Sequence, residues 1–368
     1  MVSMLYYITI LLTGLLMNLL LFYRFPFLRK SDKNDPDYKV SIIIPARNEE
    51  INLSFLLEDL QHQSYPIHEV ICVDDCSTDH TAQIISSFGT ELISIIDKPE
   101  DWMGKSWACQ KGAEASDGDM LLFLDADVRM KPEAVACLIQ AYDENQCVIS
   151  LQPYHWMKKR YEQFSLFFNL IQIAANGTTA VFKDRNAGLF GPVILIPKDC
   201  YHAVGGHSSI KNSIVDDLAM GESLKKNGFL YKLFLGGEYI SFRMYPGCFS
   251  ELRLGWTKNY ATGAQRTPKG LLLMVFLWIT SCVSVIQCII QSIITFDLRF
   301  LIVSVIFYFL WVFELYRTAH RIGQFKKCTL ICFPICLFFF LWIFIQSIVK
   351  KLFHRTVFWK DRSIKLER

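Results

Sequence analysis

The sequence has little net charge and no closely paired cysteines, and both absences narrow its possible functions. Its 38 lysines and arginines nearly balance 35 acidic residues, which gives a net charge of +3. So small a charge implies no nucleic-acid partner. The 12 cysteines include no pair at the Cys-x-x-Cys spacing of a zinc knuckle. Cys328, Cys332 and Cys336 fall at helical spacing in an apolar run, where we expect buried thiols rather than a metal site.

The N-terminal residues 5–23 carry no charge and are long enough to cross the roughly 30 Å hydrocarbon layer of a membrane. No basic residue precedes them and no small-residue cleavage site follows, so we expect residues 1–24 to form a retained anchor rather than a signal peptide. Four basic residues between positions 24 and 33 place the chain that follows in the cytoplasm by the positive-inside rule.

A second apolar block, residues 271–350, predicts two to three membrane helices, and a basic tail, residues 351–368, follows it. The connection at 317–327 and the tail are both basic, so both favour the cytoplasmic side. The last apolar segment, which contains Pro334, is therefore either a span, a re-entrant hairpin or an interfacial helix. The sequence predicts a multi-pass protein of the cell membrane.

Between the two apolar blocks, residues 38–265 read as one α/β domain facing the cytoplasm. Runs rich in β-branched residues alternate with segments of helical apolar spacing. The expected strands are 39–45, 69–75, 91–97 and 121–124, and the expected helices are 49–64, 80–88 and 106–116. This order predicts a mostly parallel, Rossmann-like sheet that binds its ligands beyond the carboxyl ends of its strands.

The strand that ends at residue 124 is followed by two acids, Asp125 and Asp127. Side chains two apart in an extended segment point to the same side, so these carboxylates can converge. Two like charges so close are unfavourable unless a cation lies between them, and a divalent cation with oxygen ligands fits. The alternative is that these acids cap the helix that begins after Lys131.

Other expected strand ends are also polar. Residues 45–50 follow the first strand and residues 74–79 the second, where Asp74 or Asp75 could instead cap the next helix. A carboxylate at that position can accept hydrogen bonds from a nucleobase or a ribose. Gly104 and Lys105 suit a tight turn that approaches a phosphate at the start of a helix.

These motifs, in their order and approximate spacing, resemble glycosyltransferase family 2 with the GT-A fold. The resemblance rests on SIIIPARNEE, VDDCSTD, WMGKSWA and FLDADV and covers about residues 38–265. It implies that Asp125 and Asp127 form the family's DxD motif, in which the second acid binds Mg²⁺ or Mn²⁺ and the first contacts ribose or metal. That metal would neutralise a nucleoside diphosphate leaving group. The resemblance places the remaining donor contacts at Pro45, Arg47, Glu49, Asp75 (to uracil) and Lys105.

The second half of the domain resembles the family's acceptor side. Gly205 and Gly206 would allow a close backbone turn there. Asp217 would be the general base for an inverting transfer, although the family often has Glu-Asp here and Asp216 remains open. The alternative is a helix N-terminus with two favourable acids.

Polymerisation is disfavoured, because the QxxRW motif of processive synthases is missing where it is expected: Gln265 is followed by Arg-Thr-Pro. The chain instead resembles the bacterial carotenoid glycosyltransferases around Arg243, Trp256 and Lys258. This resemblance implies transfer of glucose from UDP-glucose to the carboxyl end of a C30 carotenoid acid, on the route to staphyloxanthin-type pigments. Two alternatives remain: the same chemistry on a diacylglycerol, hopanoid or polyprenyl phosphate, or a non-catalytic membrane component.

A lipid acceptor also agrees with residues 164–182, which are apolar and aromatic but interrupted by amides. A span here would put the DxD acids and Asp217 on opposite sides of the membrane. We therefore expect an interfacial helix, or else a core helix of the α/β domain. An ionised carboxylic acid needs no general base, so Asp217 should matter less than for a hydroxyl, and Arg243 or Lys258 could hold the acceptor carboxylate.

Overall fold

A computed structural model describes residues 2–31, 38–182, 186–213, 215–353, 356–359 and 362–365, with side chains for all of these except 2–4, 258–262 and 351 onward. The chain divides into two compact units. We call the first the apolar unit; it comprises Met1–Phe25, Met157–Ala187 and Tyr245–His354. We call the second the α/β unit; it comprises Pro26–Trp156, Gly188–Met244 and Arg355–Arg368.

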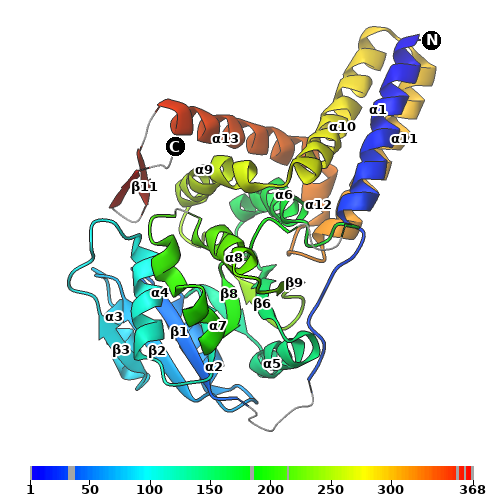
Figure 1. Ribbon diagram of the computed structural model, residues 1–368. Coiled ribbons are helices and arrows are strands. Elements are labelled where there is room, and N and C mark those ends of the chain that lie inside the picture. Colours follow the sequence, from blue (N-terminus) through cyan, green and yellow to red (C-terminus); the bar gives the residue numbers. More distant parts are fainter. Residues whose placement is uncertain are drawn as a thin grey trace. The chain divides into compact units, whose positions relative to one another are not determined.

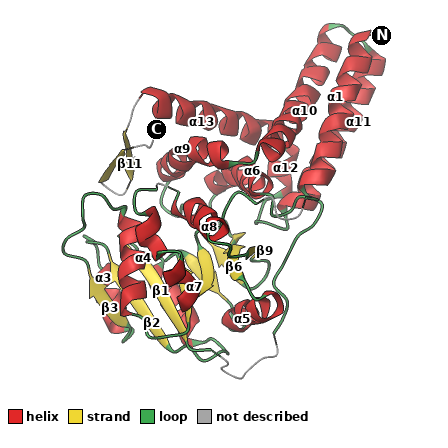
Figure 2. Cartoon of the chain, in the orientation of Figure 1, coloured by secondary structure: helices red, strands yellow, loops and turns green. Residues whose placement is uncertain are grey.

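The α/β unit contains a seven-stranded sheet with strand order β3-β2-β1-β4-β8-β6-β9 (Figures 1 and 2). Its strands are β1 (Val40–Ala46), β2 (Glu69–Asp74), β3 (Glu91–Ser94), β4 (Met120–Leu124), β6 (Val148–Gln152), β8 (Val193–Pro197) and β9 (Tyr231–Leu235). Neighbouring strands pair in parallel except on both sides of β8, which is antiparallel to β4 and β6. The expected mostly parallel sheet is confirmed.

Two smaller sheets accompany this one in the chain. The first has the order β5-β10-β7 and consists of β5 (Val128–Met130), β7 (Tyr154–His155) and β10 (Ile240–Phe242). The second is the hairpin of β11 (Thr356–Trp359) and β12 (Arg362–Lys365). The short strand β5 follows the two acids of the DxD motif, so it separates them from the next helix.

The helices of the α/β unit pack on a sheet whose central strands are buried on both faces. They are α2 (Leu53–Gln61), α3 (Thr81–Ser87), α4 (Gly104–Ala115), α5 (Ala134–Asn145), α7 (Lys198–Ala203), the 3₁₀ helix η2 (Gly206–Ile210) and α8 (Asp216–Lys226). Ile42 and Ile44 join the core with α2 and α5, while Ile71 and Val73 pack with Ala108 of α4. Continuous apolar runs are what strands covered on both faces require.

Helix α4 lies close to the sheet because Gly112 faces it. A Cβ at Gly112 would lie 2.5 Å from Cγ2 of Ile43 and 3.2 Å from Cγ2 of Val73. This close packing fixes the height of the helix over β1 and β2. The first turn of α4, with Lys105, is thereby held at the carboxyl ends of the parallel strands.

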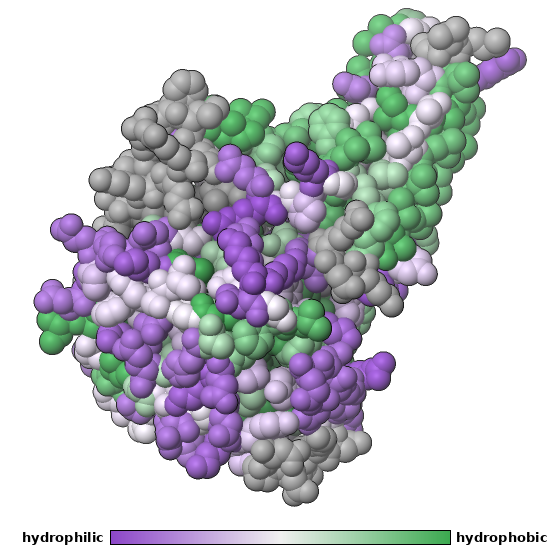
Figure 3. Space-filling view, in the orientation of Figure 1, coloured by the Kyte–Doolittle hydropathy of each residue, from purple (hydrophilic) through white to green (hydrophobic). Residues whose placement is uncertain are grey.

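The regular elements described in the apolar unit are all helices. They are α1 (Val2–Leu21), the 3₁₀ helix η1 (Arg160–Ser165), α6 (Leu166–Asn176), α9 (Phe249–Arg266), α10 (Lys269–Ile294), α11 (Leu298–Ala319), α12 (Lys327–Ile331) and α13 (Phe333–Phe353). Helices α1, α10 and α11 form a bundle, and Figure 3 shows its hydrophobic surface in green. Gly14 lets α1 approach α10 so closely that an added Cβ would lie 2.0 Å from the Cβ of Ser281. Small residues at such contacts are typical of membrane helices.

Three of these helices are long and apolar enough to cross a membrane: Lys269–Ile294, Leu298–Ala319 and Phe333–Lys350. The chain is thus suited to membrane association. Figure 1 shows, however, that α13 runs across the α1–α10–α11 bundle rather than along it. The helix before it, α12, ends at Ile331, two residues before α13 begins, so the chain turns next to Pro334.

The segment expected to be an interfacial helix differs from that expectation. Its helix, α6, is shorter than the apolar run and is buried along most of its length within the apolar unit, where it packs on α10 and α13. The ring of Phe168 is stacked on Trp256 of α9 and contacts Phe340 of α13. An apolar, aromatic sequence fits burial under other helices as well as burial in lipid, so the sequence alone could not separate the two.

The expectation of three buried thiols was wrong for two of them. Cys336 is buried, and its thiol lies 3.8 Å from the carbonyl oxygen of Gln163. Cys328 and Cys332 are exposed, because the helix breaks between α12 and α13 and the helical spacing does not continue across the break. All the described cysteines are free thiols.

Candidate active site

A pocket opens at the carboxyl ends of β1 and β4, where the sequence predicted ligand binding. Its polar lining combines Lys105, Asp125, Asp216, Asp217 and His207. The rest of the lining is Pro45, Cys109, Phe123, Leu124, Gly191, Ile194 and Met220. A lining that combines charged and apolar side chains suits a ligand with a charged part and a part that must be kept from water.

Lys105 lies in the first turn of α4 and forms the central ion pair of the pocket. Its Nζ is 2.6 Å from Oδ1 of Asp125, and both side chains remain partly exposed. Burial alone would lower the pKa of Lys105, but attraction from Asp125 and Asp216 outweighs it and raises that pKa well above the ordinary value. The lysine therefore stays cationic and can face a phosphate.

Asp217, at the start of α8, is held by two backbone N–H groups. Gly191 donates to its Oδ2 at 3.1 Å, and Leu218 donates to its Oδ1 at 2.8 Å. Burial, followed by repulsion from Asp216, raises the pKa of Asp217 to about 6, against the attraction of Lys105. Its carboxylate is thus fixed in orientation and ionised at neutral pH.

Three glycines allow this approach between α8 and the segment before β8. A Cβ at Gly221 would lie 2.6 Å from Cα of Gly188, and a Cβ at Gly188 would lie 2.5 Å from Cα of Leu218. A Cβ at Gly191 would come within 3.3 Å of both Asp217 Oδ2 and Lys105 Nζ. The missing side chains therefore let the backbone of Gly191 reach the carboxylate of Asp217.

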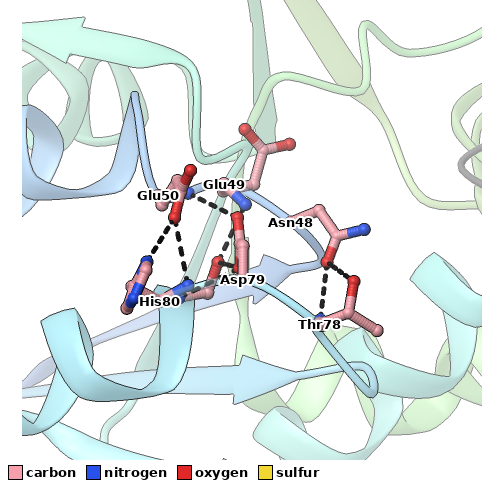
Figure 4. A network of polar contacts seen from close by, with 7 residues as sticks. Asn48, Glu49, Glu50, Thr78, Asp79 and His80 are labelled. Carbon is pink, nitrogen blue, oxygen red and sulfur yellow. Dashed lines mark hydrogen bonds and ion pairs between the residues drawn. The ribbon is translucent and has the colours of Figure 1, made fainter.

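The ends of β1 and β2 are joined by a polar network that includes the expected nucleotide residues. Arg47 donates from Nη1 to the carbonyl oxygen of Asp75 at 2.6 Å. Figure 4 shows the neighbouring contacts, in which Asn48 Oδ1 accepts from the backbone of Thr78 at 2.8 Å and Glu50 accepts from His80 at 2.8 Å. The network holds the two loops together beside Pro45, the residue of this group that lines the pocket.

Glu49 and Asp75 lie in the same two loops. The backbone N–H of Glu49 donates to Thr81 Oγ1 at 2.9 Å, and its carboxylate accepts from Asn52 at 3.2 Å. The backbone N–H of Asp75 donates to the carbonyl oxygen of Ala46 at 2.8 Å, and its side chain is buried. Neither residue lines the pocket itself.

The structure does not bear out the helix-capping alternatives for Asp74, Asp125 and Asp127, whereas Asp216 and Asp217 do lie in the first turn of α8. Helix α3 begins at Thr81, and the acid that accepts from the N–H of Thr81 is Asp79, at 3.0 Å. Asp74 instead accepts from the backbone of Ser77 at 3.1 Å and closes a turn. Helix α5 begins at Ala134, beyond β5, so the two acids of the DxD motif do not cap it.

Asp125 and Asp127 point to the partly exposed side of the chain, and Ala126 between them is buried. They lie in a turn between β4 and β5, closed by the N–H of Val128 donating to the carbonyl oxygen of Asp125 at 3.1 Å, and not in the extended segment that the sequence predicted. The carbonyl oxygen of Asp127 accepts from the backbone of Arg243 at 3.4 Å, so Arg243, from the loop after β10, lies next to the motif. Asp127, expected to bind the metal, and Arg243, expected on the acceptor side, are therefore neighbours.

The other expected acceptor residues lie elsewhere in the chain. Trp256 belongs to α9 of the apolar unit, where it is buried and donates from Nε1 to Ser165 Oγ at 3.2 Å. Lys258 lies in the same helix, and its side chain is outside the described residues. Gly205 and Gly206, with φ of +76° and +52°, form the tight turn that begins η2, as the sequence predicted.

His207 lines the pocket and was missed by the sequence analysis. It follows the two turn glycines directly, and a Cβ at Gly206 would lie 2.6 Å from the ring of Tyr201. The imidazole packs edge-on against Phe123, with ring centroids 5.1 Å apart. The signal available in the sequence was a histidine placed immediately after a Gly-Gly turn, but only the fold brings it to the pocket.

Within the described part of the chain, no three His, Cys, Asp or Glu side chains are grouped so as to hold a metal ion by themselves. Asp125 and Asp127 nevertheless provide the hard oxygen donors that Mg²⁺ and Mn²⁺ prefer. Mg²⁺ commonly binds through one or two carboxylates together with substrate phosphates and water. The pair therefore fits a metal that arrives with a nucleotide.

Comparison with known proteins agrees with this geometry. Residues 41–190 match the family Glycosyl transferase family 2. The chain is 32% identical over 357 residues to the 4,4'-diaponeurosporenoate glycosyltransferase of Staphylococcus aureus (strain USA300), covering 95% of this chain and 94% of that protein. The same enzyme of strain MRSA252 is 32% identical over 359 residues, with 95% and 94% covered.

A solved structure shares the fold across nearly the whole chain. The mannosyltransferase PcManGT from Pyrobaculum calidifontis, in complex with GDP-Man and Mn²⁺, superposes with a TM-score of 0.56 at 15% identity and covers 95% of this chain and 99% of its own. Fold and pocket together define a glycosyltransferase with a GT-A fold. The chain belongs to glycosyltransferase family 2.

Proposed function

We propose that the protein transfers glucose from UDP-glucose to the carboxyl end of a C30 carotenoid acid such as 4,4'-diaponeurosporenoate, with inversion at the sugar carbon. The observation that carries this proposal is the 32% identity to the diaponeurosporenoate enzyme over 95% of the chain, which includes the apolar helices as well as the α/β unit. Sequence identity over both the α/β unit and the apolar helices favours a lipid acceptor shared with that enzyme, because a carotenoid would bind at the apolar helices.

The donor is assigned to the loops beyond β1, β2 and β4. Asp75 would contact uracil beside Arg47, and Asp125 would contact the ribose or share the metal. Asp127 would be the main ligand of Mg²⁺ or Mn²⁺, since Lys105 already pairs with one oxygen of Asp125. When bound, such a metal neutralises charge on the leaving diphosphate. Lys105, cationic and at the start of α4, would add charge on the same phosphates.

The acceptor carboxylate would attack the sugar carbon while the bond from that carbon to the diphosphate oxygen breaks, which releases UDP and forms an acyl glucoside. A carboxylic acid is already ionised at neutral pH, so no proton has to be removed. Asp217 would then serve to orient the pocket more than to accept a proton. Arg243, whose backbone N–H donates to Asp127, would hold the carboxylate by charge.

For the membrane, we propose that α1, α10 and α11 span the bilayer and that α13 lies in its cytoplasmic interface. The course of α13 across the bundle supports this arrangement. It also removes the conflict in charge, because the basic connection after α11 and the basic tail then lie on one side. The α/β domain would face the cytoplasm, where nucleotide sugars are made available.

The test is transfer of radiolabelled glucose from UDP-glucose to diaponeurosporenoate by membranes that contain the protein. We expect labelled carotenoid with Mg²⁺ or Mn²⁺, loss of product with EDTA, and a fall of about a hundredfold or more in Asp127→Ala. Asp117→Ala, an exposed acid away from the pocket, is the matched control and should retain full activity. Label in a diacylglycerol, hopanoid or polyprenyl phosphate instead would contradict the acceptor assignment and leave the family chemistry intact.

A further inference from the structure

We propose that Nε2 of His207 accepts a hydrogen bond from a hydroxyl group of the sugar being transferred and thereby contributes to selection of the donor sugar. The inference rests on the proposed function, because it takes the pocket to hold a nucleotide sugar. It starts from the hydrogen bonds behind the imidazole, which fix where the ring carries its single proton.

Gln110 of α4 provides the fixed end of this network. The backbone N–H of Ser208 donates to Gln110 Oε1 at 3.1 Å, and Gln110 Nε2 donates to Glu114 at 3.1 Å. These two contacts set the orientation of the amide, since Oε1 must face the backbone donor. The hydroxyl of Tyr201 lies 3.2 Å from the same Oε1 and donates to it.

The hydroxyl of Tyr201 has only one proton, and we assign that proton to Gln110 Oε1, which can only accept, because this assignment makes all three contacts of the hydroxyl hydrogen bonds. The hydroxyl oxygen of Tyr201 accepts the backbone N–H of His207 at 3.1 Å and lies 2.9 Å from His207 Nδ1. Nδ1 can join this oxygen only as a donor, so the proton of the neutral ring is on Nδ1. Nε2 is left with its lone pair as a hydrogen-bond acceptor. Burial lowers the pKa of His207 to about 4, which keeps the ring neutral under working conditions.

Among the described residues, the hydrogen bonds of His207 run through its backbone N–H and Nδ1 and not through Nε2. Its ring lines the pocket although the residue is only 5% exposed. The ring shares this pocket with Asp216, Asp217 and Lys105. Lys105, the cationic donor in this pocket, is paired with Asp125, so the donor for Nε2 is left to the ligand. An ionised carboxylate and a diphosphate have no proton to offer, and the proposed nucleoside contacts belong to Asp75 and Asp125. The hydroxyls of the hexose remain as the matching groups.

The experiment compares UDP-glucose with its 2-, 3-, 4- and 6-deoxy analogues in the wild-type enzyme and in His207→Phe. For wild type we expect one analogue to lose about tenfold to a hundredfold in kcat/KM, because a buried acceptor is left without its donor. In His207→Phe we expect a similar loss with UDP-glucose and no further loss with that analogue. Binding of UDP alone should change less than about twofold, which also shows that the variant folds.

Tyr201→Phe, which removes the group that holds the tautomer, should weaken the discrimination without abolishing it. His202→Phe, an exposed histidine of α7, is the matched control and should behave as wild type. If His207→Phe still discriminated between UDP-glucose and the deoxy analogue as wild type does, the inference would be overturned and the proposed function would stand. A large loss of UDP affinity in His207→Phe would overturn the inference in the same way. If wild type transferred no sugar, the proposed function would fail. The role of His207 would then be decided by calorimetry, which compares the affinities for UDP-glucose and for UDP in wild type and in His207→Phe.

Discussion

At the scale of single residues, the site brings together opposite charges, whose interactions are stronger where bulk water is excluded. Lys105 is attracted by Asp125 and Asp216, and Asp217 is fixed by two backbone donors. Each of these groups has a partner before any substrate arrives. Little reorganisation is then needed when the donor binds, which is the condition for effective electrostatic catalysis.

Asp217→Asn tests whether the acceptor is an acid. Because an ionised acceptor needs no base, turnover on the carotenoid acid should fall by no more than about tenfold. Asp217, with its pKa raised to about 6, takes up a proton as the pH falls through 6. For a hydroxyl acceptor, kcat/KM would therefore drop below pH 6 and the variant would lose several orders of magnitude.

The measurement is the pH dependence of kcat/KM in wild type and variant between about pH 5 and pH 8, with UDP binding as the control for folding. Asp216→Asn is the companion variant, because the sequence left open which of the two acids acts. Coinciding profiles support an acid acceptor. A fall of kcat/KM below pH 6 that is seen in wild type and is absent from Asp217→Asn would refute the acid acceptor.

The residues of this site were predicted unevenly from the sequence. Pro45, Lys105, Asp125 and the two acids of α8 were expected and do line one pocket, because strand ends and helix starts leave clear local signals. His207 was missed, since its place depends on two glycines with positive φ and on packing against Phe123. Whether these residues perform the assigned roles stays a prediction for the experiments above.

At the scale of elements, glycines determine how closely α8 approaches the segment that precedes β8. Gly221 and Gly188 meet backbone to backbone, and this contact places Asp217 against the N–H of Gly191. Such a contact leaves no space for a methyl group, so the geometry of the site depends on a helix interface as much as on the acids themselves.

Gly221→Ala should therefore shift α8 away from this segment. Overpacking of this kind costs about 1–3 kcal/mol in the free energy of unfolding, and we expect activity to fall with it. Gly263→Ala in α9, where an added Cβ meets nothing within 4 Å, is the matched control and should be neutral or up to about 1 kcal/mol stabilising. Denaturant unfolding in detergent measures both. Equal stability of the two variants would contradict the packing argument.

The strands and helices of the α/β unit followed the sequence patterns well, as β1, β2 and α4 illustrate. Buried β-branched runs have few alternatives, and each expected strand before Asp125 was found. The segment around α6 was misjudged because periodicity reports that a face is apolar but does not say what covers it. Helices α10 and α13, distant in sequence, supply that cover.

At the scale of the whole molecule, length and composition alone count α13 among the possible spans, whereas its course relative to the bundle argues for a helix in the interface. Its outward side chains include Ile335, Phe338, Trp342, Ile345 and Val349. Together they make one apolar surface along the helix, which suits a helix lying in the headgroup region.

Spin labels at Ile335→Cys and Val349→Cys, in a protein whose exposed cysteines Cys248, Cys328 and Cys332 are replaced by serine, test this arrangement. These positions are 14 residues apart, about 21 Å along a helix, so a spanning α13 would put them at very different depths. An in-plane α13 predicts nearly equal depth, measured by relaxation with oxygen and with a water-soluble nickel complex. Labels at Thr295→Cys, in the connection between α10 and α11, should report the opposite side of the membrane. A large difference in depth between the first two labels would restore the span.

The central claim is that the product is an acyl glucoside formed at a carotenoid carboxyl group. Its most direct test is the reaction of the labelled product with neutral hydroxylamine, which cleaves esters and leaves ordinary glycosides intact. We expect the wild-type product to release its glucose and to yield a carotenoid hydroxamate that mass spectrometry identifies. A labelled lipid that survives hydroxylamine would mean that the sugar was transferred to a hydroxyl group, and it would contradict the proposed acceptor.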